Sequence, residues 1–480
     1  MPLLVGLLVV PLLRSARSML LCNGVAVILS SVVCSLIALE TAGGATVSAL
    51  DGWLVADALS GVHLLLLGAV FSLSSVHGVR FFGREVARDM LTLAQVRRLV
   101  LLWQGTMAAM LLLLLSDDLG LMWVGMELAT LLTAFLIAVR LTKPAVEAMW
   151  KYLLLTSVGM AFAFLGILLV AAAVTSRSAD GGVSLRLSQL MGIAGGLDPT
   201  LLKLGFVCLL VGYGTKVGLA PMHNWLPDAH SQAPAPISAM FSGIMLNTAL
   251  YCILRYLPLL SAVGAWPWAG GLMVILGLLS LIVAATFMVH QRDLKRLLAY
   301  SSIEHMGLMT LGIGLGGIGI YAAMLHGIGH AAGKSGAFLA AGKLGQSGHA
   351  YDLKTLSGII RTTPLWGGAM LLSLLALLGL APFVMFLSEL LVIQAALAAS
   401  SPVPLLVVLV TLGIIFAATL RVVVILGLGP REAQQRRLPT DSVDVTLAVA
   451  PLALLLLLGL WLPAPLVSLL SHAAAIVGGG

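Results

Sequence analysis

The amino-acid sequence predicts an all-α polytopic membrane protein, and both its composition and its apolar runs support that class. The 480-residue chain is 60% hydrophobic and 9% charged, whereas soluble domains carry roughly 25% charged residues. Apolar runs of roughly 20 residues recur along the whole chain, and this is the length that a helix needs to cross the hydrocarbon core. Helices satisfy their own backbone hydrogen bonds in lipid, and the alternating segments typical of a membrane β-barrel are not visible.

We expect about fourteen membrane segments by this length criterion. The first, PLLVGLLVVPLL, is short, but it lacks a positively charged start and an A-x-A cleavage site, so we interpret it as a retained helix. Whether it crosses the membrane stays open. In chain order the segments are residues 2–13, 19–39, 53–76, 97–115, 119–140, 145–174, 201–222, 235–257, 266–289, 296–316, 318–342, 364–395, 402–427 and 444–471.

The loops between these segments alternate in charge. Arginines follow the first and third segments, whereas acidic residues follow the second and fourth. Because basic loops stay in the cytoplasm, we expect both termini in the periplasm of a bacterial plasma membrane. The longest outer loop, residues 175–200, contains the run VSLRLSQLMGI, which is typical of a short amphipathic helix on the membrane surface.

Composition also excludes several functions. The net charge of +7 is better explained by positive-inside topology than by a nucleic-acid partner. The four cysteines form no close set that could bind an iron–sulfur cluster, and no phosphate-binding glycine motif is present. We therefore expect no cofactor, no metal and no redox centre in this chain, with the lipid bilayer as its surroundings.

Two GLAP motifs interrupt long apolar segments, one from Gly218 to Pro221 and one from Gly379 to Pro382. A shift of 161 positions (379 minus 218) places segments four to eight over segments nine to thirteen. Because five helices is an odd number, the second unit enters the membrane from the opposite side, which predicts two inverted repeats that each contain a broken helix. The breaks indicate water-accessible cavities, although a plain packing kink is the alternative for either one. The expected units are residues 1–96, two five-helix repeats at 97–258 and 259–427, and a C-terminal loop and helix at 428–480.

Ionisable residues inside the apolar segments are the most informative feature, because each costs at least ~2.5–3.5 kcal/mol at a helix centre. Three of them recur at every fourth position and so share one helix face. A chain of acids, amines and imidazoles can hold and release protons, and a proton crossing 100 mV involves ~2.3 kcal/mol. The set assigned to a proton pathway is Glu127, Lys151, Lys216, His223, Lys295, Glu304, His305, His326, His330, Lys334 and Glu389.

Plainer interpretations exist for several of these residues. Lys151 and Lys295 could extend their amines to a membrane interface. Glu127 and Lys216 could form a purely structural ion pair, and His223 could be a hydrogen-bonded core histidine. The histidine stripe is disfavoured as a metal site, because lysine is a poor ligand and no carboxylate or cysteine joins it.

The runs KVGLAPMHNWLPDAHSQAPAPISA, QRDLKRLLAYSSIEHMG, HGIGHAAGKSGAF and GLAPFVMFLSE resemble the antiporter-like subunits of respiratory complex I. They are most similar to hydrogenase-4 component F, a membrane subunit of group 4 NiFe hydrogenases of the formate hydrogenlyase type. The resemblance covers roughly residues 50–430. It implies proton translocation driven by a cytoplasmic hydrogenase and iron–sulfur module, with other membrane subunits as partners.

The resemblance also implies roles for individual residues. Glu127 matches the family's fifth-helix glutamate, Lys216 the lysine of the broken seventh helix, and Lys295 a lysine of the tenth-helix region. His326, His330 and Lys334 match the eleventh-helix relay, and Glu389 matches the terminal Lys or Glu of the broken twelfth helix.

One departure concerns the eighth helix, where relatives usually carry Lys or His and this chain has Ser242 and Asn247. Neither residue titrates, so the link between the two halves either uses ordered water or is absent. The alternatives to a hydrogenase subunit are a membrane subunit of NADH-quinone oxidoreductase, a cation/proton antiporter complex and a membrane scaffold that moves no ions. The scaffold is disfavoured by the cost of so many buried charges.

Overall fold

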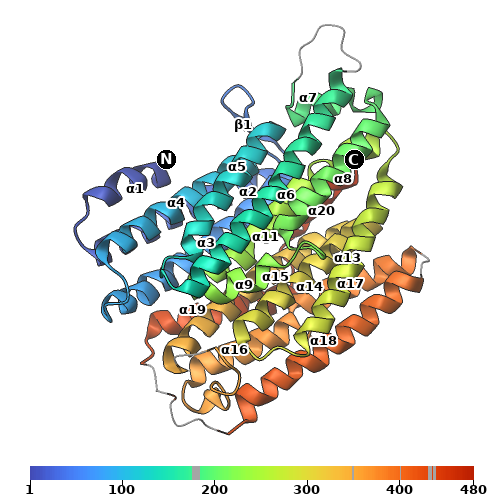
Figure 1. Cartoon of the computed structure of the whole chain (residues 1–480). Coiled ribbons are helices and arrows are strands. Elements are labelled where there is room, and N and C mark those ends of the chain that lie inside the picture. Colours follow the sequence, from blue (N-terminus) through green and yellow to red (C-terminus); the bar gives the residue numbers. More distant parts are fainter. Residues whose placement is uncertain (176–183, 349–350, 400–401, 431–434, 436–438, 480) are drawn as a thin grey trace.

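The computed structural model describes residues 1–175, 184–348, 351–399, 402–430, 435 and 439–479. Long helices run side by side through the molecule (Figure 1), and ten of the helices described are long and apolar enough to cross a membrane. The predicted fold class, an all-α membrane protein, is confirmed. The count of about fourteen membrane segments, the inverted-repeat relation and the four unit boundaries stay predictions.

The N-terminal part begins with α1 (Pro2–Val9) and a 3-10 turn η1 (Val10–Leu12), followed by α2 (Ala16–Thr41) and α3 (Ala58–Val86). Between α2 and α3 lies a hairpin of β1 (Val47–Ala49) and β2 (Leu54–Ala56), paired antiparallel with Ser48 opposite Val55. The expectation of a helix from residue 53 is therefore wrong for its first residues. Asp57 sets the true start of α3, because its carboxylate accepts a hydrogen bond from the Ser60 backbone at 2.9 Å.

The next helices lie mostly within residues 97–258, the range expected for the first repeat. They are α4 (Leu93–Leu115), α5 (Leu119–Ile137), α6 (Lys143–Thr175), the short α7 (Leu187–Ile193) with the 3-10 turn η2 (Ala194–Gly196), and α8 (Pro199–Val217). The helix α7 lies within the run expected to form a surface helix, part of which is outside the described residues. Glycines bring α6 and α8 together, since a Cβ on Gly212 would lie 2.5 Å from the Ala163 nitrogen.

Both GLAP motifs end a helix. α8 stops at Val217 and the chain turns at Gly218, whose φ of +80° favours glycine. The short α9 (Trp225–Gln232) follows, then α10 (Ala235–Met240), the π-helical turn η3 (Phe241–Met245), α11 (Leu246–Leu254) and α12 (Leu257–Ala262). In the second break, Gly379 has φ of +67° and separates α16 (Pro364–Leu377) from α17 (Val384–Ala398).

The second half packs around α15 (Ile318–Gly348), which is buried along most of its length. Its other helices are α13 (Trp266–Met288), α14 (Leu294–Leu315), the 3-10 turn η4 (Ile359–Arg361) and α18 (Pro402–Leu428). The last expected segment, residues 444–471, is two helices rather than one: α19 (Ser442–Leu460) and α20 (Ala464–Gly478). Trp461 is extended at this interruption, and Pro463 cannot donate a backbone hydrogen bond.

An ion-pair cluster fixes one end of the bundle, which we call the basic end because Arg80, Arg84, Arg140 and Arg292 lie there. Lys343 on α15 contacts Asp444 on α19 at 2.6 Å, and their side chains are only 1% and 0% exposed. Arg80 of α3 lies 3.4 Å from Asp444 and 2.5 Å from Asp441, and Arg84 lies 3.9 Å from Asp444. The cluster therefore joins α3, α15 and α19.

Candidate proton pathway

The amine of Lys216 is held inside the first half of the bundle. It lies in the last turn of α8 and is fully buried, and its Nζ donates a hydrogen bond to the Tyr152 hydroxyl of α6 at 2.7 Å. Tyr152 is also hydrogen-bonded to Thr133 of α5 at 2.8 Å. Three helices thus meet at this lysine.

Glu127 lies near Lys216 without touching it. Its Oε1 accepts a hydrogen bond from Ser157 of α6 at 3.2 Å, while its buried Oε2 has no partner among the described residues. The two charged groups interact electrostatically, but within the described part of the chain they form no direct ion pair. An unpartnered carboxylate oxygen next to a buried amine leaves room for a bridging water or a transferred proton.

A continuous set of hydrogen-bonded groups crosses the second half from α14 to α17. Ser301 contacts Glu304 at 3.3 Å and His305 at 3.3 Å. His305 Nδ1 lies 3.1 Å from His326 Nε2, and the other nitrogen of His326 lies 2.9 Å from the Ser388 hydroxyl. The structure thus brings three of the expected site residues into a single connected row.

The remaining members of the stripe on α15 flank this row. The ring of His330 lies 5.3 Å from that of His305, and both of its nitrogens are buried without a partner among the described residues. Lys334 is fully buried, donates to the Leu298 carbonyl at 2.9 Å and interacts electrostatically with Glu304. Buried polar atoms without partners are costly, so these imidazole nitrogens are the positions where water or a proton would be bound.

Glu389 lies against the second break. It follows Ser388 on α17, and its carboxylate would collide with a Cβ placed on Gly379. Only glycine gives this carboxylate room to approach the interrupted backbone. Gly379 therefore serves both the turn and the position of the acid.

Three expected site residues lie away from these groups. Lys151 is 49% exposed at the basic end and pairs with Glu147 at 2.7 Å and Asp228 at 3.2 Å. Lys295 is buried but donates to the Ser231 and Ala233 carbonyls at 3.0 and 2.5 Å. It thus satisfies backbone oxygens at the end of α9.

His223 occupies the first break itself. Its side chain is nearly buried, and its ring centroid lies 6.5 Å from those of Phe287 and Tyr300. Its Nδ1 is buried without a partner among the described residues.

His230 is a candidate that the sequence reasoning missed. It lies on α9 and is fully buried, and its ring interacts with the Leu226 backbone but has no side-chain hydrogen-bond partner among the described residues. Lys295 and Lys334 both interact with it electrostatically, so it lies between the first GLAP break and the histidine stripe on α15. The available signal was its position within the run NWLPDAHSQ, directly after the first break.

The eighth-helix positions differ in their surroundings. Ser242, in η3, is hydrogen-bonded to Ser302 of α14 at 2.7 Å, so a pair of hydroxyls bridges the two halves. Asn247 donates to the Gly243 carbonyl at 2.9 Å, and its Oδ1 is buried without a partner among the described residues. Where the resemblance implies Lys or His, this chain thus has polar groups that can bind water.

Comparison with known proteins shows which family the chain belongs to. Residues 116–416 match the family model described as NADH:quinone oxidoreductase/Mrp antiporter, transmembrane. A hydrogenase-4 component F homolog from Methylacidiphilum infernorum is 39% identical over 362 residues, which cover 75% of each chain. The chain belongs to this antiporter family. It is an antiporter-like membrane subunit of the proton-translocating type, and the resemblance inferred from its motifs is confirmed.

Solved structures give the same fold for this antiporter-like subunit. A chain of the membrane-bound sulfane sulfur reductase, an archaeal respiratory membrane complex, superimposes with a TM-score of 0.87 at 22% identity, covering 99% of this chain and 96% of the other. A chain of respiratory complex I from Thermus thermophilus superimposes with a TM-score of 0.77 at 26% identity, covering 96% of both chains.

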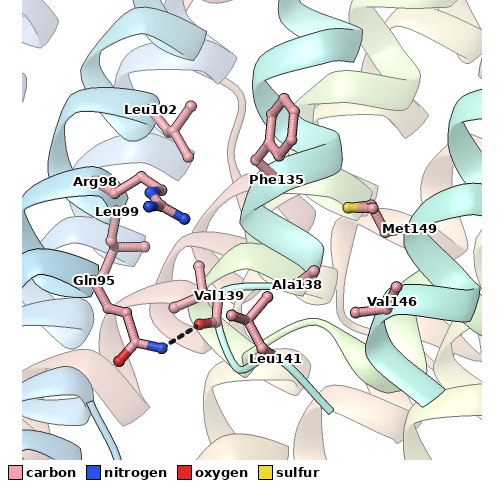
Figure 2. Close-up of a pocket in the computed structure, with 10 residues that line it drawn as sticks. All are labelled: Gln95, Arg98, Leu99, Leu102, Phe135, Ala138, Val139, Leu141, Val146 and Met149. Atoms are coloured by element: carbon pink, nitrogen blue, oxygen red, sulfur yellow. Dashed lines mark hydrogen bonds between the residues drawn. The ribbon is translucent and has the colours of Figure 1, made fainter. Parts of the chain in front are cut away.

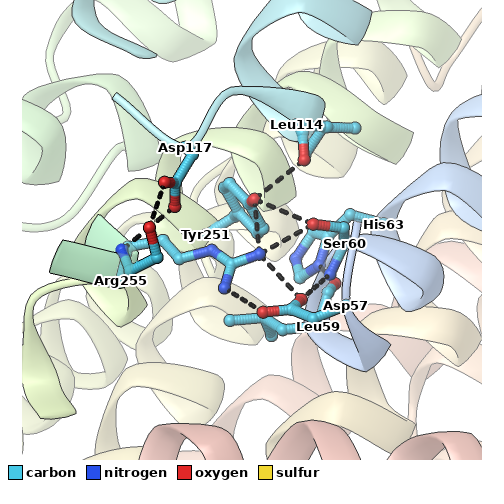
Figure 3. Close-up of polar contacts among 9 residues, drawn as sticks. Asp57, Leu59, Ser60, His63, Leu114, Asp117, Tyr251 and Arg255 are labelled. Carbon is cyan, nitrogen blue, oxygen red and sulfur yellow. Dashed lines mark hydrogen bonds and ion pairs between the residues drawn. The ribbon is translucent and has the colours of Figure 1, made fainter. Parts of the chain in front are cut away.

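A second polar network in this subunit surrounds Arg255 (Figure 3). It lies at the end opposite the basic end, because Asp57 caps the start of α3 whereas Arg80 and Arg84 lie near its last residues. Arg255, which follows α11, binds both carboxylate oxygens of Asp57 at 2.5 and 2.8 Å, and it also donates to Ser60 and Tyr251. His63 packs edge-on against Tyr251 with ring centroids 5.0 Å apart. Burial opposes ionisation of Asp57, but the Arg255 guanidinium holds the pKa of that carboxyl below its usual value.

Proposed function

We propose that this chain conducts protons across a bacterial plasma membrane as a subunit of a group 4 hydrogenase-type complex, in which electron transfer elsewhere drives the movement. The observation that carries the proposal is the buried row Glu304, Ser301, His305, His326 and Ser388, which ends beside Glu389. Each member either titrates or can relay a proton through a hydroxyl. Such a row is expensive to bury without function.

The first half would supply protons through Glu127 and Lys216. The Tyr152 hydroxyl and the free Glu127 oxygen both face this region, so a water between them would complete the connection. Moving negative charge toward or away from the lysine would change the free energy of protonating it. The broken end of α8, directly after Lys216, gives local freedom for that change.

His230 would join the two halves in place of the eighth-helix lysine. Lys295 and Lys334 interact with it electrostatically, and in the neutral ring one nitrogen can accept a proton or a hydrogen bond from water. The Ser242–Ser302 hydroxyl pair supports the same connection at a second point. A positive charge on either amine disfavours protonation of an imidazole between them, which would favour sequential transfer.

The proposal extends to orientation and partners. The basic end would face the cytoplasm and both termini the periplasm. The partners would be other membrane subunits and a cytoplasmic hydrogenase and iron–sulfur module, as the name of the hydrogenase-4 relative suggests. This chain would contribute no redox centre. A membrane subunit of an NADH-quinone oxidoreductase or a cation/proton antiporter complex is the less favoured alternative.

The test is proton uptake by inverted membrane vesicles that contain the intact complex, measured with a pH-sensitive dye while electron transfer is monitored separately. Glu127→Gln, Lys216→Met and His230→Leu should each reduce proton uptake per electron at least several-fold while the complex still assembles. His290→Leu and Lys354→Met are matched controls, because both residues are exposed, and they should leave uptake unchanged. Unaltered coupling in all three variants would refute the pathway. Companion subunits without NiFe or iron–sulfur centres would refute the hydrogenase assignment alone.

A further inference from the structure

A pocket of about 260 Å³ opens between α4, α5 and α6 at the basic end (Figure 2). Its wall is mostly apolar, formed by residues that include Leu102, Phe135, Leu141 and Met149. Phe135 and Leu141 are 55% and 72% exposed, so the pocket is open on the side where the bilayer would lie. An apolar pocket open to lipid suits a hydrocarbon chain rather than water.

One cation lies at this pocket. Arg98 is exposed, begins the second turn of α4, and has no hydrogen-bond or ion-pair partner among the described residues. The other polar side chain of the wall, Gln95, is already engaged, since its amide donates to the Val139 carbonyl at 3.3 Å and its oxygen accepts from Thr92. The guanidinium is therefore the one group at the pocket that still lacks a counter-charge.

The surroundings of Arg98 favour an anion. The neighbouring Arg97 donates to the Leu13 carbonyl at 3.1 Å, which leaves its charge uncompensated, and Lys143 is exposed at the start of α6. Arg140, by contrast, is paired with Glu85. Basic pockets between membrane helices bind the head groups of anionic lipids, each basic residue adding about 1 kcal/mol, and a guanidinium matches phosphate with two parallel hydrogen bonds.

We propose that this pocket is a binding site for an anionic phospholipid, with the lipid phosphate on Arg98 and one acyl chain packed along Leu102, Phe135 and Met149. The charge of Arg98, near the helix ends, matches the head group of such a lipid. The apolar wall matches its acyl chain. A zwitterionic lipid carries the same phosphate, but its ammonium group cancels the net negative charge, and free phosphate lacks the chain.

Occupancy would affect the helices that carry the proton pathway. The pocket is walled by α5 and α6, and the same two helices hold Glu127 and Ser157 at 3.2 Å across their interface. A bound chain would fix the spacing of these helices. Lipid binding itself does not depend on the proposed function, but this consequence rests on it.

The experiment uses the full-length protein, purified in its complex and placed in nanodiscs or detergent with a defined lipid. Dioleoyl-phosphatidylglycerol should raise the unfolding temperature and remain bound in native mass spectrometry, whereas dioleoyl-phosphatidylcholine or inorganic phosphate alone should not. Arg98→Gln should weaken phosphatidylglycerol binding about 5- to 10-fold, as expected for the loss of one basic contact at 1–1.4 kcal/mol. The matched control is Arg421→Gln, because Arg421 is also exposed on a membrane helix but donates to the Gln291 carbonyl at 2.9 Å.

A second variant keeps the test decisive if Arg98→Gln folds poorly. Met149→Trp would fill the pocket while leaving Arg98 in place, and it should also reduce retained phosphatidylglycerol. The proposal would be overturned if the two lipids bound equally well, or if both variants bound phosphatidylglycerol as well as the wild-type protein. A helix of another subunit found in the pocket would also overturn it. These outcomes concern lipid only, so they are distinct from a failure of the proton pathway.

Discussion

Replacing Asp444 with asparagine should destabilise the protein more than replacing its partner Lys343 with methionine. The two side chains are almost completely buried and lie 2.6 Å apart. Asparagine keeps an oxygen that can accept from the Lys343 amine but carries no charge, and among the described residues this amine then has no counter-charge, only the Trp366 ring, whose centroid is 5.3 Å away. Without the amine, Asp444 still has Arg80 at 3.4 Å and Arg84 at 3.9 Å. The asymmetry follows from these remaining partners.

The expected loss of unfolding free energy depends on which charged partner remains buried after each substitution. A stranded buried charge costs about 3–5 kcal/mol, which is the expectation for Asp444→Asn. Lys343→Met removes one hydrogen bond to a charged group, worth about 1.5–3 kcal/mol. In the double variant no charge is stranded at Lys343, and Arg80 keeps Asp441 at 2.5 Å. Adding Asp444→Asn to Lys343→Met should therefore cost about 1 kcal/mol or less, because Arg80 and Arg84 are partly exposed.

The assay is a double-mutant cycle on purified protein in mixed micelles, unfolded by titration with SDS and followed by tryptophan fluorescence. The expected coupling energy is about 2 kcal/mol or more, in the range measured for residues in direct contact. Gln346→Ala provides a nearby control, since Gln346 contacts Arg84 only at 3.4 Å. Additive single effects, or Lys343→Met proving the more harmful change, would refute the stranded-charge reasoning.

Two further predictions concern packing and acid stability. Gly212→Leu should destabilise the protein by about 1–3 kcal/mol through overpacking between α6 and α8. Gly413→Leu should be nearly neutral, because nothing lies within 4 Å of a Cβ at that position. SDS titration of both variants compares their free energies of unfolding. Arg255 holds the pKa of Asp57 below its usual value in the folded protein. The ionised Asp57 therefore stabilises the fold fully above its unfolded pKa of about 3.9, and this stabilisation is lost as pH falls through its pKa in the folded protein. The difference in melting temperature between wild type and Asp57→Asn should accordingly shrink as pH falls below about 4, and a constant difference would contradict the sign of that shift.

The sequence predicted the membrane helices well because their boundaries depend on local properties. Length, hydropathy and loop charge act within single segments, and both GLAP motifs end helices where expected. The hairpin at residues 47–56 was missed because Leu54, Val55 and Ala56 are as apolar as a helix start. The interruption before Ala464 was also missed, although Pro463 was a visible local signal for it.

The candidate site was less predictable because it depends on contacts between distant segments. The histidine stripe on α15 could be read from its spacing, but its connection to His305 and Ser388 is visible only in three dimensions. His230 carried no spacing signal, because no titratable residue lies three or four positions from it on the same face of α9. Lys295 was identified as a buried cation, yet nothing local indicated that its amine would be taken up by the Ser231 and Ala233 carbonyls.

The Asp57–Arg255 pair has a consequence for insulation of the membrane. Asn247, Tyr251 and Arg255 follow one another at intervals of four, so they line one face from the interior toward the end opposite the basic end. A permanent file of water along this face would dissipate the transmembrane voltage as a leak. Arg255 binds Asp57, Ser60 and Tyr251 at this end of the face, and such a neutral, mutually hydrogen-bonded group would interrupt a file of water while the pair is intact.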